Sequence, residues 1–148
     1  MANSLQMQKL ITRKFCYELV NNGDIPPLLQ YRAEFTVGIQ GAPSTPPVPP
    51  GQLLIIAIGC DIIGTDAHQN EYTFAKVTYE AGSLFQWDGE DTEDNINHLV
   101  RTAGLDLLAN AARGHLYTLC KSVGAPIDVL FPVINTGALV WTDSTPST

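Results

Sequence analysis

The hydrophobic period of this sequence changes once, shortly after residue 88. Before that point apolar residues alternate with polar ones, most clearly from Tyr31 to Gln40, which is the period of a half-buried strand. Beyond it, apolar residues recur at the helical spacings i, i+3, i+4 and i+7, at Ile96, Leu99, Val100 and Ala103. Strands followed by helices predict an α+β domain, in which one antiparallel sheet carries helices on one face.

Four extended stretches are predicted before the change, at Gln6–Glu18, Tyr31–Gln40, Gln52–Ile63 and Glu71–Gly82. The third is continuously apolar, which is typical of a central strand covered on both faces. A turn-rich segment joins it to the fourth stretch, so these two should form an antiparallel hairpin. A final short extended piece, Leu84–Trp87, follows. The predicted fold is a four-stranded antiparallel sheet with two helices packed on one face.

The first helix is expected to follow the acidic run Asp88–Asp94, because carboxylates favour the positive end of a helix. Gly104 is predicted to cap its C-terminus. The second, longer helix should end at Gly124, with Pro126 beyond it. Its apolar face is predicted to carry Leu108, Ala112, Leu116, Leu119 and Val123.

The 148 residues are enough for a single domain, 1–148, that buries a core without disulfides or metal. Residues 41–51 contain five of the ten prolines and are predicted to form a polyproline-like or mobile loop. An alternative function for this loop is a Pro46-x-x-Pro49 ligand for a proline-binding module. The tail from Ile127 to Leu139 is apolar and should be extended, and residues 143–148 are expected to fray.

The net charge of −7 and the scattered positions of the eight Lys and Arg residues exclude two classes of partner. Without a basic run there is no electrostatic footprint for nucleic acid. An acidic chain is also poorly matched to anionic membrane surfaces. The most apolar stretch, Leu53–Ile63, is about half the ~20 residues that a spanning helix needs.

The N-terminal segment Met1–Gln8 lacks the charge and apolar pattern of a signal peptide. Three widely separated cysteines, Cys16, Cys60 and Cys120, are expected to be reduced thiols. Both features favour a cytoplasmic location.

No motif for catalysis or metal binding emerges from the sequence. His68, His98 and His115 lack the spacing of a metal site. The acidic run Asp88–Asp94 has five acids in seven residues but lacks the ligand pattern of a calcium-binding EF-hand. There is no P-loop, Gly-x-Ser-x-Gly or Gly-x-Gly-x-x-Gly string. We therefore expect no enzyme activity, cofactor or metal, and an active site built from distant residues, such as His98 with the acidic run, is the alternative.

The strands carry more aromatic and aliphatic side chains than one covered sheet face needs. Residues of the first two stretches, Ile11, Phe15, Tyr17, Phe35, Val37 and Ile39, are too apolar to face water comfortably. Burying each would contribute about 1.5–3 kcal/mol. Either subunits pair through such surface, or an extended peptide occupies a groove beside it.

The order of the elements and several local strings resemble the SecB family of export chaperones, from Leu5 to Leu139. The strings are Gln6–Thr12 with Glu18, Tyr72–Phe85, and Gly124-Ala125-Pro126 followed by Leu130, Pro132, Asn135, Ala138 and Leu139. The second is similar to the family's Phe-x-x-Glu-Val-x-x-x-Gly-x-Phe run, and the third to its Gly-x-Pro…Leu-x-Pro-x-Asn-Phe-x-Ala-Leu ending. Their order and spacing together carry the resemblance.

The resemblance implies a dimer of dimers, a homotetramer, with long hydrophobic grooves that hold unfolded or extended polypeptide without ATP. By position it assigns peptide contacts to Ile11, Phe15, Tyr17, Val37 and Ile39. The predicted function is thus that of an ATP-independent holdase chaperone whose partner is a client polypeptide.

Several departures from the family pattern bear on the choice of client. Family members that hand clients to the SecA motor carry acidic residues on the exposed sheet face. Lys14 and Lys76 stand where carboxylates are expected, and Glu18 alone keeps its sign. Reversed charges would remove the steering contacts of such an interface. The family's Cys-Pro…Leu-Phe-Pro segment is Ala103–Asn110 here. These departures argue against SecA as a partner.

A dedicated SecB-like chaperone, which protects a particular antitoxin or another aggregation-prone protein, fits these departures better. A general SecA-coupled export chaperone is one alternative. An oligomeric adaptor or structural protein, whose apolar surface is wholly used in self-assembly, is another.

Overall fold

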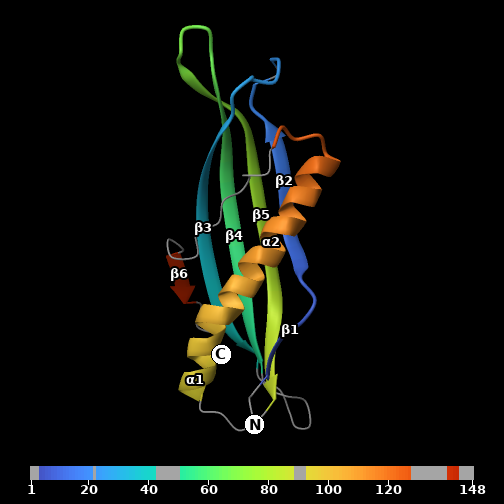
Figure 1. The fold of residues 1–148 in the computed structure, drawn as a ribbon, viewed down its shortest axis with the longest axis vertical. Coiled ribbons are helices and arrows are strands. Elements are labelled where there is room, and N and C mark those ends of the chain that lie inside the picture. The colour runs from blue at the N-terminus through green and yellow to red at the C-terminus, as the bar shows by residue number, and fades with distance from the viewer. Residues whose placement is uncertain (1–3, 22, 43–50, 89–92, 128–139, 144–148) are drawn as a thin grey trace.

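The computed structural model describes residues 4–21, 23–42, 51–88, 93–127 and 140–143. Within them, six strands form one sheet, and a helical segment crosses one of its faces (Figure 1). The strands are β1 (Ser4–Met7), β2 (Ile11–Leu19), β3 (Gln30–Ala42), β4 (Gly51–Thr65), β5 (Glu71–Asp88) and β6 (Val140–Asp143). The predicted α+β class, with helices on one face of an antiparallel sheet, is confirmed.

The sheet differs in detail from the four strands expected. β3, β4 and β5 are antiparallel neighbours, and β6 adds a short parallel strand at the edge of β3. The stretch predicted as one strand is split into β1 and β2, which pair one after the other with β5. At the break, the Gln8 amide donates to the Leu84 carbonyl at 2.8 Å, and the Ser83 hydroxyl donates to the Gln8 carbonyl at 2.7 Å. The interruption therefore stays attached to β5.

The hairpin expected between the third and fourth stretches is confirmed. β4 and β5 remain paired up to Thr65 and Glu71 at its turn. β3 and β4 pair as far as Ala42 and Gly51, so both ends of the predicted Pro-rich loop belong to strands, and residues 43–50 lie outside the described chain. The piece Leu84–Trp87 is not separate, because β5 continues through it without a break.

The two predicted helices form one continuous helical segment. It consists of α1 (Glu93–Leu99), a π-helical turn η1 (Val100–Gly104) and α2 (Leu105–Ser122). The prediction that Gly104 caps a helix is wrong, because its backbone is helical, with φ −63° and ψ −43°. A Cβ at Gly104 would lie 3.3 Å from the Phe85 ring, so the glycine allows the helical segment to approach β5 closely. The predicted end at Gly124 is confirmed by its positive φ of 75°.

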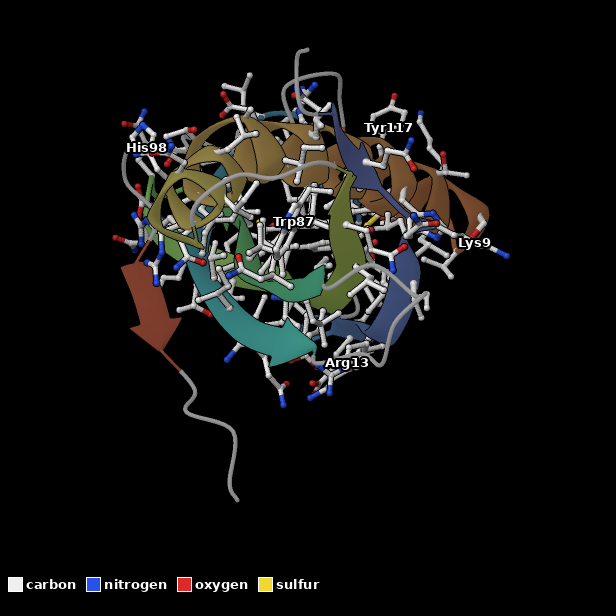
Figure 2. All side chains as sticks on the ribbon, turned by 90° about the horizontal axis from the view of Figure 1, so that it is seen from below. Lys9, Arg13, Trp87, His98 and Tyr117 are labelled. Atoms are coloured by element: carbon white, nitrogen blue, oxygen red, sulfur yellow. The ribbon has the colours of Figure 1, made fainter. Side chains whose placement is uncertain are left out.

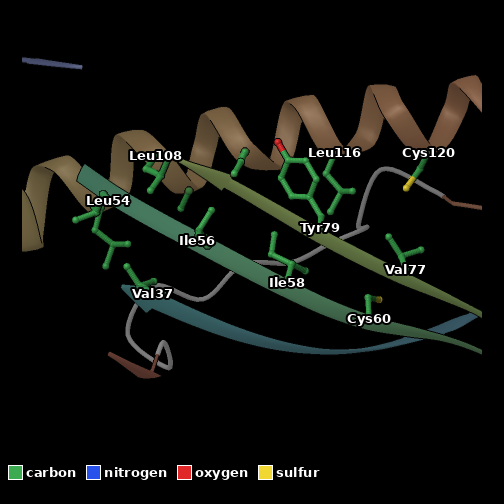
Figure 3. Packing of buried hydrophobic residues seen from close by; sticks show 14 of the residues in the cluster. Val37, Leu54, Ile56, Ile58, Cys60, Val77, Tyr79, Leu108, Leu116 and Cys120 are labelled. Carbon is green, nitrogen blue, oxygen red and sulfur yellow. The ribbon is translucent and has the colours of Figure 1, made fainter. Parts of the chain in front are cut away.

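One face of the sheet packs against α2, and the sheet curls around the helix when seen along the long axis (Figure 2). The inward face of α2 contributes side chains about one turn apart, and they meet the inward side chains of β4 and β5 (Figure 3). The labelled members of this core are Val37, Leu54, Ile56, Ile58, Cys60, Val77, Tyr79, Leu108, Leu116 and Cys120.

The expectation that Gln52–Ile63 is covered on both faces is wrong. β4 is central in the sheet, but its burial alternates within the described chain: Ile56 and Ile58 are buried, Ile55 and Ala57 are half-buried, and Gly59 is exposed. The helix covers one face only, so Ile55, Ala57 and Gly59 lie on the face turned away from it. We call that second surface the open face.

Two glycines of the helical segment allow a matched test of this packing. A Cβ at the exposed Gly114 would meet nothing within 4 Å, so Gly114→Ala should raise the free energy of unfolding by about 0.5–1 kcal/mol. Gly104→Leu should lower it by about 1–3 kcal/mol, because the new side chain has no room beside Phe85. Chemical denaturation measures both changes. Stabilisation by Gly104→Leu would contradict the close approach.

Candidate functional site

The sheet is wider than the helix that packs on it. An α-helix with its side chains is about 10–12 Å across, whereas four strands spaced about 4.8 Å apart span roughly 14–19 Å. α2 runs diagonally, with its C-terminal end beside β2 and its N-terminal end toward β3 (Figure 1). Apolar side chains on both sides of the helix are therefore only half-buried among the described residues. The β2 flank comprises Leu10, Phe15 and Tyr17, and the β3 flank comprises Tyr31, Ala33, Phe35 and Ile39.

The structure separates the five residues to which peptide contacts were assigned by position. Phe15 and Tyr17 lie together on the β2 flank, and Ile39 lies on the β3 flank. Val37 lies on β3 between Phe35 and Ile39 and is 0% exposed, so a peptide could reach it only by opening the core packing. Ile11 is 61% exposed and lies on the open face. The five residues do not form one surface, and peptide contact by each stays a prediction.

A β-bulge explains why Ile11 and Phe15 lie on opposite faces. Their spacing of four residues would place both on one face of a regular strand. The register of β2 against β5 shifts between Thr12 and Lys14, leaving Arg13 as the extra residue. Arg13 projects on the side of the sheet away from α2 (Figure 2). The sequence hinted at this irregularity, because Lys9 and Arg13 share the parity of the apolar residues.

A set of exposed apolar residues was missed by the sequence analysis. Leu19, Val20, Ile25 and Leu28 are 50–79% exposed and follow one another from the end of β2 toward β3. We call these four residues the apolar end patch. The segment that carries them runs from β2 to β3 at the end of the molecule where α2 has its C-terminus (Figure 1). A usable signal was present: apolar residues placed among turn-forming residues have no strand or helix period that could bury them all.

The backbone of this segment is held in place, which gives the apolar end patch a defined position. The amides of Val20 and Asn21 both donate to the Phe74 carbonyl, at 2.9 and 3.1 Å. Pro26 is buried against Gly64, where a Cβ would lie 2.5 Å from the proline ring. The exposed side chains therefore project from an anchored connection.

Among the described residues of the covered face, burial shifts the pKa values of two thiols and two phenols. Burial raises the pKa of the Cys60 thiol to about 12, helped by the neighbouring Asp61 carboxylate, and raises that of Cys120 to about 11. Burial also raises the pKa of Tyr17, with a smaller contribution from Cys120. The Tyr79 hydroxyl, hydrogen-bonded to Thr12, likewise has a pKa raised by burial. Thiols and phenols held in their neutral forms are poor nucleophiles.

Other site types find little support in the described chain. No group of three or more His, Cys, Asp or Glu side chains within it could hold a metal ion. The outer side of α2, its longest helix, carries mostly polar residues. No helix of this part of the chain is long and apolar enough to cross a membrane. What the covered face offers is apolar contact surface along the flanks and the end patch.

The burial of two cysteines predicts the reactivity of all three. At about pH 8, Cys60 and Cys120 should stay protonated and shielded, whereas Cys16 is exposed. Iodoacetamide should therefore modify one thiol per folded chain and all three in concentrated guanidinium chloride. Intact-protein mass spectrometry counts the adducts. Rapid modification of two or more thiols under native conditions would contradict this packing.

Comparison with known proteins supports the fold. No family model and no curated protein matches the sequence. Among solved structures, the chain is similar to the Mycobacterium tuberculosis Rv1957 SecB-like chaperone in complex with a ChAD peptide from the Rv1956 HigA1 antitoxin, with a TM-score of 0.61 and 18% identity over 88% of this chain and 91% of that chain. A protein of unknown function from Streptococcus agalactiae is less similar, with a TM-score of 0.43 and 12% identity over 88% of this chain and 98% of that chain. The first likeness shows that this chain has a SecB-like fold.

Proposed function

We propose that this chain is an ATP-independent holdase chaperone that binds unfolded or extended polypeptide and serves a dedicated client, such as an antitoxin. The observation that carries the proposal is the apolar end patch, whose exposed side chains project from a segment anchored at Val20, Asn21 and Pro26. The half-buried β2 and β3 flanks extend apolar surface along both sides of α2. A SecB-like fold supports the proposal, since the Mycobacterium tuberculosis protein of that fold was solved with a bound antitoxin peptide.

The physical basis is burial of apolar side chains from the client. An extended polypeptide presents alternate side chains on opposite sides, so a strip of apolar surface can accept every second residue. Each apolar side chain that becomes fully buried contributes about 1.5–3 kcal/mol, and ordering the client offsets part of this gain. Several partial contacts give reversible holding, which requires no nucleotide.

The charges on the open face favour a dedicated client over general SecA-coupled export. Lys14 and Lys76 lie on the open face beside Glu80 and Glu18, so that face carries both signs rather than an acidic field. A cationic partner surface that recognises a uniformly acidic sheet would meet like charges there. We therefore assign no role to SecA. The proposal also places the chaperone in the cytoplasm as a homo-oligomer and assigns it no enzymatic activity.

Light scattering of an unfolding model client tests the holdase function. Addition of the protein at equal subunit concentration should suppress aggregation of a reduced, unfolding protein without ATP. An absence of suppression at a severalfold excess would favour the adaptor alternative, in which the apolar surface serves self-assembly only. Tight, salt-sensitive binding to SecA in the same buffer would contradict the dedicated function and support the general export alternative.

The apolar end patch can be tested with two matched leucines. Leu19, in the patch, and Leu107, on the outer side of α2, are both 50% exposed. Leu19→Glu should weaken binding of a fluorescently labelled unfolded protein by roughly fivefold or more, because a charge replaces apolar contact area. Leu107→Glu should leave the affinity within about twofold, since a surface substitution away from the patch has a small effect.

Leu28→Glu, at the most exposed position of the patch, should weaken binding in the same direction. Circular dichroism and thermal unfolding of each variant check that the fold is kept. Equal loss of affinity in Leu19→Glu and Leu107→Glu would show that the patch is not the client site.

A further inference from the structure

A row of alternating charge crosses four strands on the open face. Glu18 on β2 is the register partner of Lys76 on β5. Lys76 is in turn the partner of Asp61 on β4, and Asp61 is the partner of Arg32 on β3. The signs across the sheet are therefore minus, plus, minus, plus. Beside this row, a hollow of about 700 Å³ lies over Gly59, where a Cβ would meet nothing within 4 Å.

Most of these charges are not neutralised by an ion pair within the chain. Opposite charges on neighbouring strands can stabilise a sheet by about 0.2–1 kcal/mol when they meet. Among the described residues, the salt bridge that forms joins Arg32 to Glu71. Glu18, Lys76 and Asp61 have no ion-pair partner in that part of the chain. Their charged groups are available to a partner placed against the open face.

An apolar cluster lies farther along the same face. Leu53 and Leu84 are register partners, and Ile55 and Ile11 both pair with Gly82. Ile55 and Leu53 lean over that glycine, because a Cβ there would lie 3.4 Å from Ile55 and 3.6 Å from Leu53. Ile11 is 61% exposed at the edge of this group. We call Ile11, Leu53, Ile55 and Leu84 the open-face cluster.

From this arrangement we infer that the open face binds a second copy of the chain, related to the first by a two-fold axis that runs parallel to the strands between β4 and β5. The inference is independent of the proposed chaperone function. Such an axis places β5 of one copy over β4 of the other. Lys76 then faces Asp61 of the second copy, Thr78 faces the hollow at Gly59, and Leu84 faces Leu53.

The charge pattern favours a second copy over an unrelated partner. An isologous interface must be complementary to itself, and a row that reads minus, plus, minus, plus becomes its own complement when it is reversed. Glu18 then faces Arg32 at the outer ends of the row. The open-face cluster supplies apolar area to bury, while the charged row sets the register, as buried apolar contact and peripheral charges do in specific interfaces.

The size of the face sets the expected affinity. Four strands about 4.8 Å apart and eight steps of about 3.3 Å give at most roughly 400–500 Å² of sheet area per copy. A standard interface buries about 800 Å² of accessible surface per partner, so this contact is a weak, concentration-dependent one. Because the sheet curls around α2 (Figure 2), the open face is convex, and the pairs over β4 and β5, such as Lys76 with Asp61, come closer together than the pairs on the outer strands.

Charge-reversal variants, tested separately and mixed, examine this interface by sedimentation velocity over a range of concentrations. The wild type should associate in even-numbered steps, and Lys76→Glu or Asp61→Lys should each weaken association by roughly tenfold or more, because like charges then oppose each other across the axis. An equimolar mixture of the two variants should recover most of the wild-type affinity. In the mixture, each introduced charge meets an opposite charge on the other copy.

The mixture separates this interface from a role within one chain. Residues 61 and 76 are also neighbours in the same sheet, and each single variant carries like charges there whether or not it is mixed. Recovery on mixing can therefore come only from contact between copies. A wild type that is monomeric at every concentration, or a mixture that does not recover, would overturn the proposal. If a mixture of Lys76→Glu with Glu80→Lys recovered association instead, the position of the axis would be wrong.

A steric pair of variants provides the second test. Gly59→Tyr should fold, because a Cβ at this position has open space. It should lose self-association, because the ring fills the hollow that faces Thr78 of the second copy. Gly41→Tyr is the matched control: it is also a strand glycine with nothing within 4 Å, but it lies at the end of β3 on the side of the helix. Association of folded Gly59→Tyr equal to that of the control would exclude the proposed face.

Discussion

One narrow helix, α2, packs across a sheet that is wider than the helix itself. α2 meets β4 and β5 through side chains spaced one turn apart, and that contact forms the core. Because the helix crosses diagonally, the outer strands keep apolar side chains that are only half-buried. The same asymmetry leaves the open face of the sheet without any helix among the described residues.

Close approach between helix and sheet is secured by small features of the backbone. Gly104 lets the helical segment continue past Phe85 without a cap or a bend away from the sheet. On the opposite edge, the bulge at Arg13 turns Ile11 outward and keeps Phe15 and Tyr17 beside α2. Together these features decide which apolar residues are core and which are available for contact.

The two faces of the sheet suit different partners. Apolar surface beside α2 and at the end patch suits the irregular, extended side chains of an unfolded polypeptide, because hydrophobic contact is non-directional. The open face instead carries fixed charges of alternating sign next to a small apolar cluster, and such a pattern specifies one partner in one register. In the proposed function, the helix-covered side binds an extended client, and the open face is left for a second copy of the chain.

Local periods and turn chemistry were enough to predict the fold class, three of the long strands, the hairpin between β4 and β5 and the helix end at Gly124. The sequence also indicated the excess of apolar surface and the unusual charges at Lys14 and Lys76. The folded chain was needed to show that Gly104 is helical, that Ile11 and Phe15 lie on opposite faces, that Val37 is buried, and that Leu19 and Leu28 are exposed. Those properties depend on where α2 lies relative to the sheet and on a one-residue shift in register, and neither is a local property of the chain.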